Sequence, residues 1–369
     1  MLIKFATLTC ALLLCTCSLE DRPLAVRFHE PPYPERLSAW QLLDYDEQLQ
    51  LAKDTLSYDL NTPLFTDYAH KLRTLHLPPG QAAKYTQHET FEFPVGTVVS
   101  KTFFYFQTVK KDAIRIRSTW SGHLEDLNDG KARLIETRLL VKQVKGWDAL
   151  GYIWSGDDAY LAISGDLLTL DTEDAPLNYL VPSRNQCASC HATNHTTAEI
   201  IPIGLKARHL NRASPHTNTN QLKLLTDLGW LSGLPSRDIP PAVTLDVRDS
   251  LTDMAHADLV KAARAYLDIN CGHCHNPDGP ADTSGLHLDA AAHDLATMGV
   301  CKPPIAAGRG SGGRLYSIVP GRADDSILTF RMAITDPGAM MPELGRSLVH
   351  EEGLALINAW VNSLTGECL

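Results

Sequence analysis

The chain has 369 residues, long enough for more than one domain, and its 44% hydrophobic and 21% charged residues are typical of a folded globular protein. The net charge of −10 at pH 7 leaves no basic excess to neutralise phosphates, which argues against nucleic acid as a partner. We therefore expect two or three packed domains and no binding of DNA or RNA.

The first residues have the pattern of an export signal. One lysine precedes an apolar run from Phe5 to about Thr16, and polar residues follow. The run is too short for a permanent membrane span, and no other segment approaches about 18 apolar residues. We expect a signal peptide over residues 1–17, an exported protein and no transmembrane span.

The end of this leader contains a possible lipidation site. The sequence "LCTC" resembles a lipobox, in which the signal is cut just before a cysteine that then carries lipid, here Cys17. Thr16 stands where a smaller residue is usual, so plain cleavage nearby is the alternative. The first outcome predicts an outer-membrane lipoprotein with a lipid anchor, and the second predicts a periplasmic protein.

Residues 21–180 contain no cysteine and have a β-rich pattern. Runs of β-branched and aromatic residues, separated by Gly, Asp and Asn, are "TFEFPVGTVVSKTFFYFQTV", "AIRIRSTW", "RLIETRLLVKQV", "LGYIW" and "YLAIS". They predict an antiparallel β sandwich or barrel. The segment 58–80 before them is expected to be an irregular lead-in, because Pro and Gly interrupt it.

The next segment, 181–255, contains "CASCH" at residues 187–191, directly after an expected extended stretch, "NYLVPSRNQ". The sequence "NQLKLLTDLGWL" further on predicts a helix.

The last region, 256–369, contains a second copy of the cysteine pattern. An expected helix over 256–270, with apolar residues at helical spacing, leads into "CGHCH" at 271–275. Long loops follow, then "MMPELGR" at 340–346 and an amphipathic helix, "HEEGLALINAWVNSL".

The two C-x-x-C-H motifs point to covalent haem. Two thiols separated by two residues can form thioethers with both vinyl groups of one porphyrin, and the next histidine can bind its iron. The sequence therefore predicts two haem c groups, attached to Cys187, Cys190, Cys271 and Cys274, with His191 and His275 as iron ligands.

Two other uses of these cysteines fit less well. A dithiol exchanger places its motif after a strand within a βαβ unit, whereas an expected helix precedes CGHCH. A zinc site built from two C-x-x-C pairs usually has a short loop between them, but Cys190 and Cys271 lie 81 positions apart. Export also agrees with haem c, which is attached outside the cytoplasm.

Two cysteines of the mature chain remain, Cys301 and Cys368. In an oxidising compartment a disulfide between them is the simplest expectation, and two buried free thiols are the alternative.

Region 256–369 resembles class I cytochrome c, with a helix before the haem motif, a Met-Pro loop and a final helix packed on the first. The resemblance implies that a methionine of the loop is the second iron ligand. We prefer Met341, because the family's ligand directly precedes proline. Met340 is the alternative, and its own expected role is packing in the haem pocket.

The second ligand of the first haem is left open. Candidates are Met254, three histidines of the segment (His195, His209 and His216), a residue of the β-rich region, or none. We take His209 as the candidate, against a surface histidine beside two arginines.

The whole mature chain resembles a bacterial family of exported dihaem c-type cytochromes with a β-rich N-terminal domain of unknown role. The matching pieces are "NTPLFTDYA", "FPVGT", "ETRLLV", "VPSRNQCASCH", "YLDINCGHCHNPDGPADTSGL", "IVPGRADDSIL" and "MMPELGR". The resemblance implies a multidomain α+β protein: an antiparallel β domain over 21–180, a first haem segment over 181–255 and a class I-like domain over 256–369, the last two mainly α-helical. Genes for parallel β-helix repeat proteins often neighbour those of the family, which suggests such a protein as a partner beside redox proteins.

We therefore expect an electron carrier that works by outer-sphere transfer, rather than an enzyme. A dihaem peroxidase-like enzyme with an open first haem is one alternative. A β-rich binding module with the haems as a redox tail is another.

Overall fold

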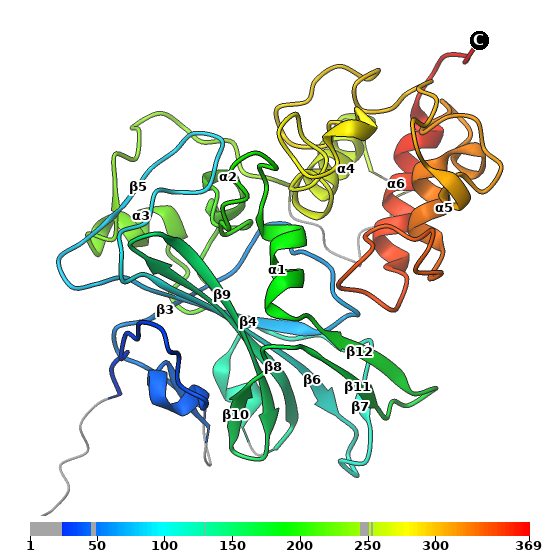
Figure 1. Ribbon diagram of the computed structural model, residues 1–369. Coiled ribbons are helices and arrows are strands. Elements are labelled where there is room, and N and C mark those ends of the chain that lie inside the picture. The colour runs from blue at the N-terminus through cyan, green and yellow to red at the C-terminus, as the bar shows by residue number, and fades with distance from the viewer. Residues whose placement is uncertain (1–23, 46–48, 129, 244–250, 252–253) are drawn as a thin grey trace, which may run out of the picture.

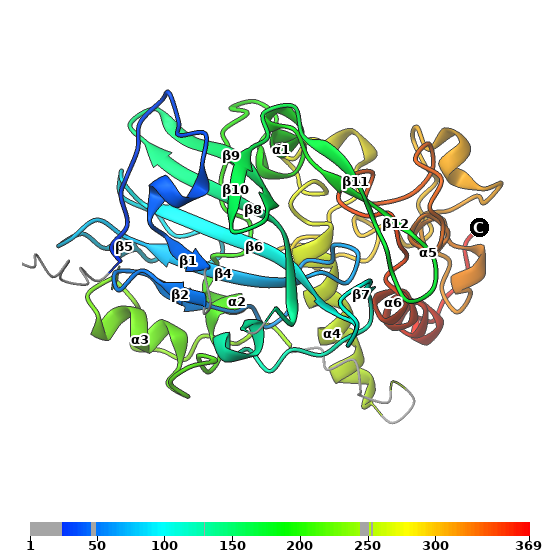
Figure 2. The same ribbon diagram turned by 90° about the horizontal axis from the view of Figure 1, so that it is seen from below.

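A computed structural model describes residues 24–45, 49–128, 130–243, 251 and 254–369 (Figure 1). The expected signal peptide and Cys17 lie outside the described residues. The chain forms a β-rich region followed by helices, and Figures 1 and 2 both place the helices α4, α5 and α6 to one side of the main sheet. The α+β class expected from the sequence is confirmed.

The main sheet has seven antiparallel strands and is open. Its order is β10-β9-β8-β6-β4-β3, with β7 also paired to β6. The strands are β3 (Leu56–Tyr58), β4 (His70–His76), β6 (Val98–Gln107), β7 (Ile114–Arg115), β8 (Ala132–Gln143), β9 (Gly146–Ser155) and β10 (Asp158–Leu161). The expected antiparallel pairing is confirmed, but β10 and β3 are edges, so this sheet does not close on itself as a barrel does.

The irregular lead-in expected over 58–80 is wrong, because β4 lies in the middle of the sheet between β3 and β6. Its two leucines, Leu72 and Leu75, are three positions apart and therefore face opposite sides. Both are buried, in different core clusters. A strand buried on both faces lacks the alternation that a sequence search looks for.

Three two-stranded ribbons flank the sheet. They are β1 (Leu43–Tyr45) with β2 (Leu49–Leu51), β11 (Asp166–Leu170) with β12 (Leu177–Val181), and β5 (Ala83–Lys84) in parallel with β13 (Leu231–Ser232). Short 3-10 helices lie at Leu37–Trp40, Leu124–Leu127, Asp282–Ser284, Gly308–Ser311 and Ala323–Asp325.

The middle segment packs against the β-rich region and shares a core with it. Its helices α2 (Ala207–Leu210) and α3 (Gln221–Asp227) are short, and the expected helix "NQLKLLTDLGWL" ends before the turn that leads to β13. The shared core joins Leu60, Leu75 and Phe91 of the β-rich region to Leu210 and Leu225. Residues 181–243 are therefore an extension of the β-rich region.

The last region has a core of its own. The two long helices expected there are confirmed as α4 (His256–Asn270) and α6 (Glu351–Ser363), and α5 (Ile327–Ala333) lies beside them. Leu259 and Tyr266 of α4 belong to one buried cluster with Leu356, Ile357 and Trp360 of α6. The helices on either side of the Met-Pro loop are thus packed on each other.

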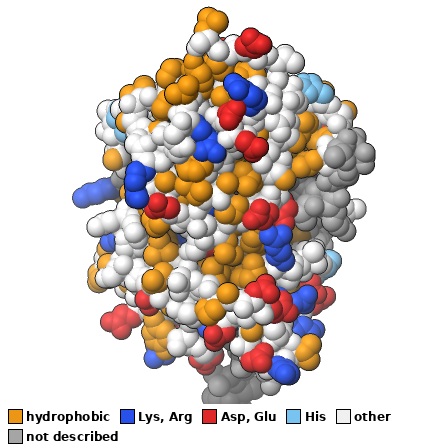
Figure 3. Space-filling view, turned by 90° about the vertical axis from the view of Figure 1, so that its right-hand side faces the viewer, with side chains coloured by type: hydrophobic (Ala, Val, Ile, Leu, Met, Phe, Trp, Pro, Cys, Tyr) orange, Lys and Arg blue, Asp and Glu red, His pale blue; other side chains and the backbone are white. Residues whose placement is uncertain are grey.

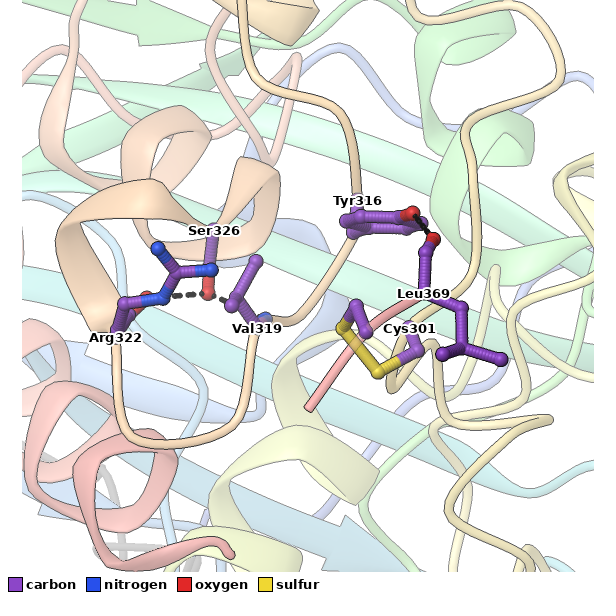
Figure 4. Close-up of a disulfide and its surroundings, with 7 residues drawn as sticks. Cys301, Tyr316, Val319, Arg322, Ser326 and Leu369 are labelled. Carbon is purple, nitrogen blue, oxygen red and sulfur yellow. Dashed lines mark hydrogen bonds between the residues drawn. A yellow bond between two sulfur atoms is a disulfide. The ribbon is translucent and has the colours of Figure 1, made fainter. Parts of the chain in front are cut away.

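Cys301 and Cys368 form a disulfide, as expected from the two leftover cysteines. Figure 4 shows it beside Tyr316, whose hydroxyl donates a hydrogen bond to the carbonyl of Leu369. The bond joins the loop after the second motif to the segment that follows α6.

In the described part of the chain, no helix has the length and apolar character needed to cross a membrane. The face on the right-hand side of Figure 1 carries apolar side chains mixed with acidic and basic ones (Figure 3).

Candidate functional site

The first motif lies on a short helix, α1 (Arg184–His191), which follows β12. The helix begins with a capping box: the Ser183 hydroxyl accepts from the Gln186 amide at 3.3 Å, and the Gln186 side chain accepts from the Ser183 amide at 2.9 Å. The stretch "NYLVPSRNQ" is therefore extended only up to the cap, because the box starts the helix earlier than expected. Cys187, Cys190 and His191 are half-buried, and no residue of α1 is fully enclosed.

The ring of His191 is oriented for metal binding through one nitrogen. Its Nδ1 lies 2.8 Å from the carbonyl oxygen of Ile201, so Nδ1 carries the proton and donates it. Burial lowers the pKa of His191 to about 3, which keeps the ring neutral. Among the described residues none forms a hydrogen bond with Nε2, and this is the atom that can bind iron.

The second motif begins where α4 ends, and its histidine is held in the same way. Nδ1 of His275 lies 3.2 Å from the hydroxyl of Ser284, which itself donates to the carbonyl of Ala281 at 2.6 Å. The serine oxygen therefore accepts from the ring, and the proton sits on Nδ1. Burial lowers the pKa of His275 to about 4, and Nε2 again has no hydrogen bond from the described residues.

All four motif cysteines are free thiols. Burial raises the pKa of Cys271 and of Cys274 to about 12, and it raises the pKa of Cys187 and of Cys190 as well. A disulfide exchanger needs the opposite, a thiol whose pKa is lowered toward neutrality. The environment of these cysteines therefore disfavours dithiol exchange.

The two motifs, far apart in the sequence, lie against each other. The thiol of Cys274 is 3.5 Å from the carbonyl oxygen of Ser189, inside the first motif. His195, which follows the first motif in the sequence, contacts the loop just after the second. Its amide and its Nδ1 lie 2.7 and 2.9 Å from the carbonyl oxygen of Asp278. The sequence contains no local signal for this contact.

The Met-Pro loop is held by an arginine that sequence reasoning missed. Met340 is buried and Met341 is half-buried. The carbonyl of Met341 accepts from the buried Arg346 guanidinium at 2.9 and 3.2 Å, and its amide donates to Arg331 at 3.0 Å. The role of Met341 as an iron ligand stays a prediction, and packing fits Met340.

His209 is fully buried, so the alternative of a surface histidine is wrong. Its Nε2 lies 2.9 Å from a carboxylate oxygen of Asp268 on α4, which also accepts two hydrogen bonds from Arg208, at 2.7 and 2.8 Å. Only Nδ1 is left for a metal, and this buried atom has no hydrogen-bond partner among the described residues. In the structure His209 joins segment 181–243 to α4, and its role as an iron ligand stays a prediction.

The described residues contain no further cluster of the kind that holds a metal ion. No group of three or more His, Cys, Asp or Glu side chains is placed to hold a metal ion. A haem iron takes four of its ligands from the porphyrin, so this result does not bear on haem. The donors present at each motif, two thiols and one imidazole with a free Nε2, fit a covalently bound haem.

No protein-family model, curated protein or solved structure matches this chain.

Proposed function

We propose that this protein is an exported dihaem c-type cytochrome that carries electrons. Each motif supplies what thioether attachment needs: two thiols at the right spacing and, next to them, a neutral imidazole whose Nδ1 is already hydrogen-bonded. When bound, each haem supplies one-electron chemistry through its iron, which cycles between ferric and ferrous states.

The observation that carries the proposal is the contact between the two motifs. Cys274 lies 3.5 Å from the backbone of Ser189, which stands between the two cysteines of the first motif. The thiols that would hold the two haems are thus brought together by the fold, which would suit electron transfer within the protein. Two independent redox tails would not need this arrangement.

The chain's own residues set the conditions for this chemistry. Ile201 and Ser284 accept the ring protons of His191 and His275, which fixes each ring and makes Nε2 a better donor. Arg346 holds the backbone of Met341, whose soft sulfur would favour the ferrous state of the second haem. We assign the higher reduction potential to that second haem.

The remaining expectations belong to the same proposal. The apolar leader supports export, and lipidation at Cys17 would place the protein at the outer membrane instead of free in the periplasm. The proposed partners are redox proteins and a parallel β-helix repeat protein encoded nearby.

The test is to produce the full chain in cells that attach haem c and to measure its mass and absorption. We expect two added haems in the intact protein, and one in each double variant, Cys187→Ala with Cys190→Ala or Cys271→Ala with Cys274→Ala. Cys301→Ser with Cys368→Ser is the matched control and should keep both haems. A colourless protein, or a mass without added haem, would overturn the proposal.

Turnover separates a carrier from an enzyme. We expect the reduced dihaem protein to be oxidised by hydrogen peroxide slowly and without catalysis. Rapid catalytic turnover together with carbon monoxide binding at one haem would favour the peroxidase-like alternative.

A further inference from the structure

Positive side chains stand in a row across three neighbouring strands of the main sheet. Arg73 of β4, Lys101 of β6 and Arg138 of β8 are register partners, so they share one face, and Lys71 of β4 lies on the same face. Like charges directly opposite each other destabilise a sheet. The row is therefore stable only if anions lie close to it.

Three of these cations converge on one aromatic ring. Lys71, Lys101 and Arg138 place their charges 5.7, 5.1 and 4.4 Å from the ring centre of Phe103. Phe103 is fully buried, whereas the two lysines and the arginine are half-buried and can be reached by a ligand.

The two arginines have carboxylate partners. Arg73 lies 2.8 Å from Asp59, and Arg138 donates to Glu136, with Nε 2.8 Å from the carboxylate. Glu136 is fully buried and also accepts from the hydroxyl of Tyr179 at 2.6 Å. Its single charge is thus already shared.

The two lysines lack such a partner. In the described part of the chain, no carboxylate lies within ion-pair distance of Lys71 or Lys101. Lys71 donates to the carbonyl of Ala69 at 2.8 Å, and Asp67 acts on it only from a greater distance. Burial lowers the pKa of Lys101 to about 7 and the pKa of Lys71 well below its usual value, and the neighbouring cations lower both further. Glu136, which is shared with Arg138 and Tyr179, offsets only part of this effect on Lys101, and Asp67 offsets only part of it on Lys71.

The first motif lies close to this face. On this face, a Cβ placed on Gly151 of β9, the register partner of Arg138, would lie 3.8 Å from the carbonyl oxygen of Pro182, which comes just before α1. Figures 1 and 2 both show α1 beside the sheet near β9. The charges of Lys101 and Arg138 act on the thiols of Cys187 and Cys190 and on the ring of His191. A haem attached to α1 would therefore be within reach of the cations.

We propose that the sheet face carrying Lys71, Lys101 and Arg138 is a wall of the first haem's site, where the two lysine ammonium groups pair with the two haem propionates. The inference rests on the proposed function and deepens it. Two ammonium groups without carboxylate partners match the two carboxylates of one haem. The alternative, a lysine that binds the iron, would explain only one of the two lysines. The β-rich region is then one half of the first haem site and not a separate module.

The test uses the dihaem protein and the variants Lys71→Gln and Lys101→Gln. Each removes a positive charge that stabilises the ferrous haem, so we expect the reduction equilibrium of the first haem to fall roughly tenfold per lysine. The absorption spectrum, which reports the iron ligands, should not change. A redox titration should show one transition per haem. Met341→His should shift the transition of the second haem, so the transition that stays in place belongs to the first haem.

Lys142→Gln is the matched control. Like the two lysines, Lys142 lies over an aromatic ring, 5.6 Å from the centre of Trp147. It is on β8, about 13 Å along the strand from Arg138. It should leave the potential in place. An unchanged potential in both lysine variants would refute the inference even with two haems attached, whereas missing haem in the wild-type protein would refute the proposed function itself.

Two other outcomes are decisive. A changed ferric spectrum or new carbon monoxide binding in Lys101→Gln would make Lys101 an iron ligand and overturn the pairing with propionates. If the Gln variants lose the first haem, Lys71→Arg and Lys101→Arg should restore it, because pairing needs the charge; failure of both Arg variants would contradict the inference.

Discussion

The two C-x-x-C-H motifs share a pattern but differ in what supports them. The second motif follows α4, which is packed in the core that α4 forms with α6. The first lies on α1, a helix of 8 residues that are at most half-buried. The second motif thus belongs to a compact helical unit. The first lies beside a sheet, and other elements of the chain must form the rest of its environment.

The difference teaches that the motif by itself does not define its site. His191 and His275 are hydrogen-bonded through the same nitrogen, one to a loop carbonyl and the other to a serine. What varies is the surroundings. Cys271 of the second motif packs against the core of α4 and α6, whereas in our proposal the first motif faces the cationic side of the sheet. Three predictions test how far the two regions depend on each other.

The largest effect is expected where the regions are joined. Asp268→Asn removes the charge that pairs with Arg208, whose side chain is largely buried, and that holds His209. Leaving a buried cation without its partner costs about 3–5 kcal/mol of unfolding free energy. Chemical unfolding followed by circular dichroism measures it.

Asp258→Asn is the control on the same helix, because its pair with Lys261 is exposed and is worth less than about 1 kcal/mol. Equal stabilities of the two variants would mean that the Asp268 cluster does not hold the regions together.

The second effect concerns His350, which stacks on Phe65 of the β-rich region at 4.3 Å and lies 3.1 Å from the hydroxyl of Tyr266 on α4. Burial lowers its pKa to about 4, so the unfolded chain binds a proton first as the pH falls. The contribution of His350 to the free energy of unfolding is therefore complete above about pH 6.5 and is lost progressively down to about pH 4, by about 2–3 kcal/mol.

Unfolding curves measured across this pH range check the loss. His350→Gln should flatten the slope, and His256→Gln, at an exposed position on α4, should not. An identical slope in wild type and His350→Gln would remove His350 as its cause.

The smallest effect is confined to the first motif. Ser183→Ala removes the cap of α1 and should cost about 1 kcal/mol locally, equal to roughly fivefold faster amide exchange in α1. Exchange in α4 should stay the same, because the cap touches nothing there.

Asn220→Ala removes the equivalent cap of α3, where the side chain accepts from two amides at 2.9 and 3.3 Å. It should speed exchange in α3 and leave α1 alone. If Ser183→Ala also changes α4, the two motif regions unfold together.

Local patterns were enough to predict part of this molecule. The helical spacing before "CGHCH" predicted α4 with the bounds that the structure has, and the leftover cysteines indicated the disulfide that is present. The helix depends on residues that are close in sequence, and the disulfide follows because only two cysteines of the mature chain lie outside the motifs.

The rest depends on contacts between distant segments. Strand β4 is defined by its neighbours β3 and β6, and the run "AIRIRSTW" contributes only the two residues of β7 because little of it finds a partner strand. The burial of His209 follows from Asp268, 59 positions away, and the row of cations follows from strand register. No window of sequence contains these pairings.

The disulfide between Cys301 and Cys368 closes the polypeptide between them into a covalent ring that contains Met341 and all of α6. A protease that cuts after the exposed Arg309, in the 3-10 helix Gly308–Ser311, would therefore nick the chain without releasing a fragment, and the pieces would separate only after reduction. The Met-Pro loop would thus stay attached at both ends after a cut that would release it from a chain without the disulfide.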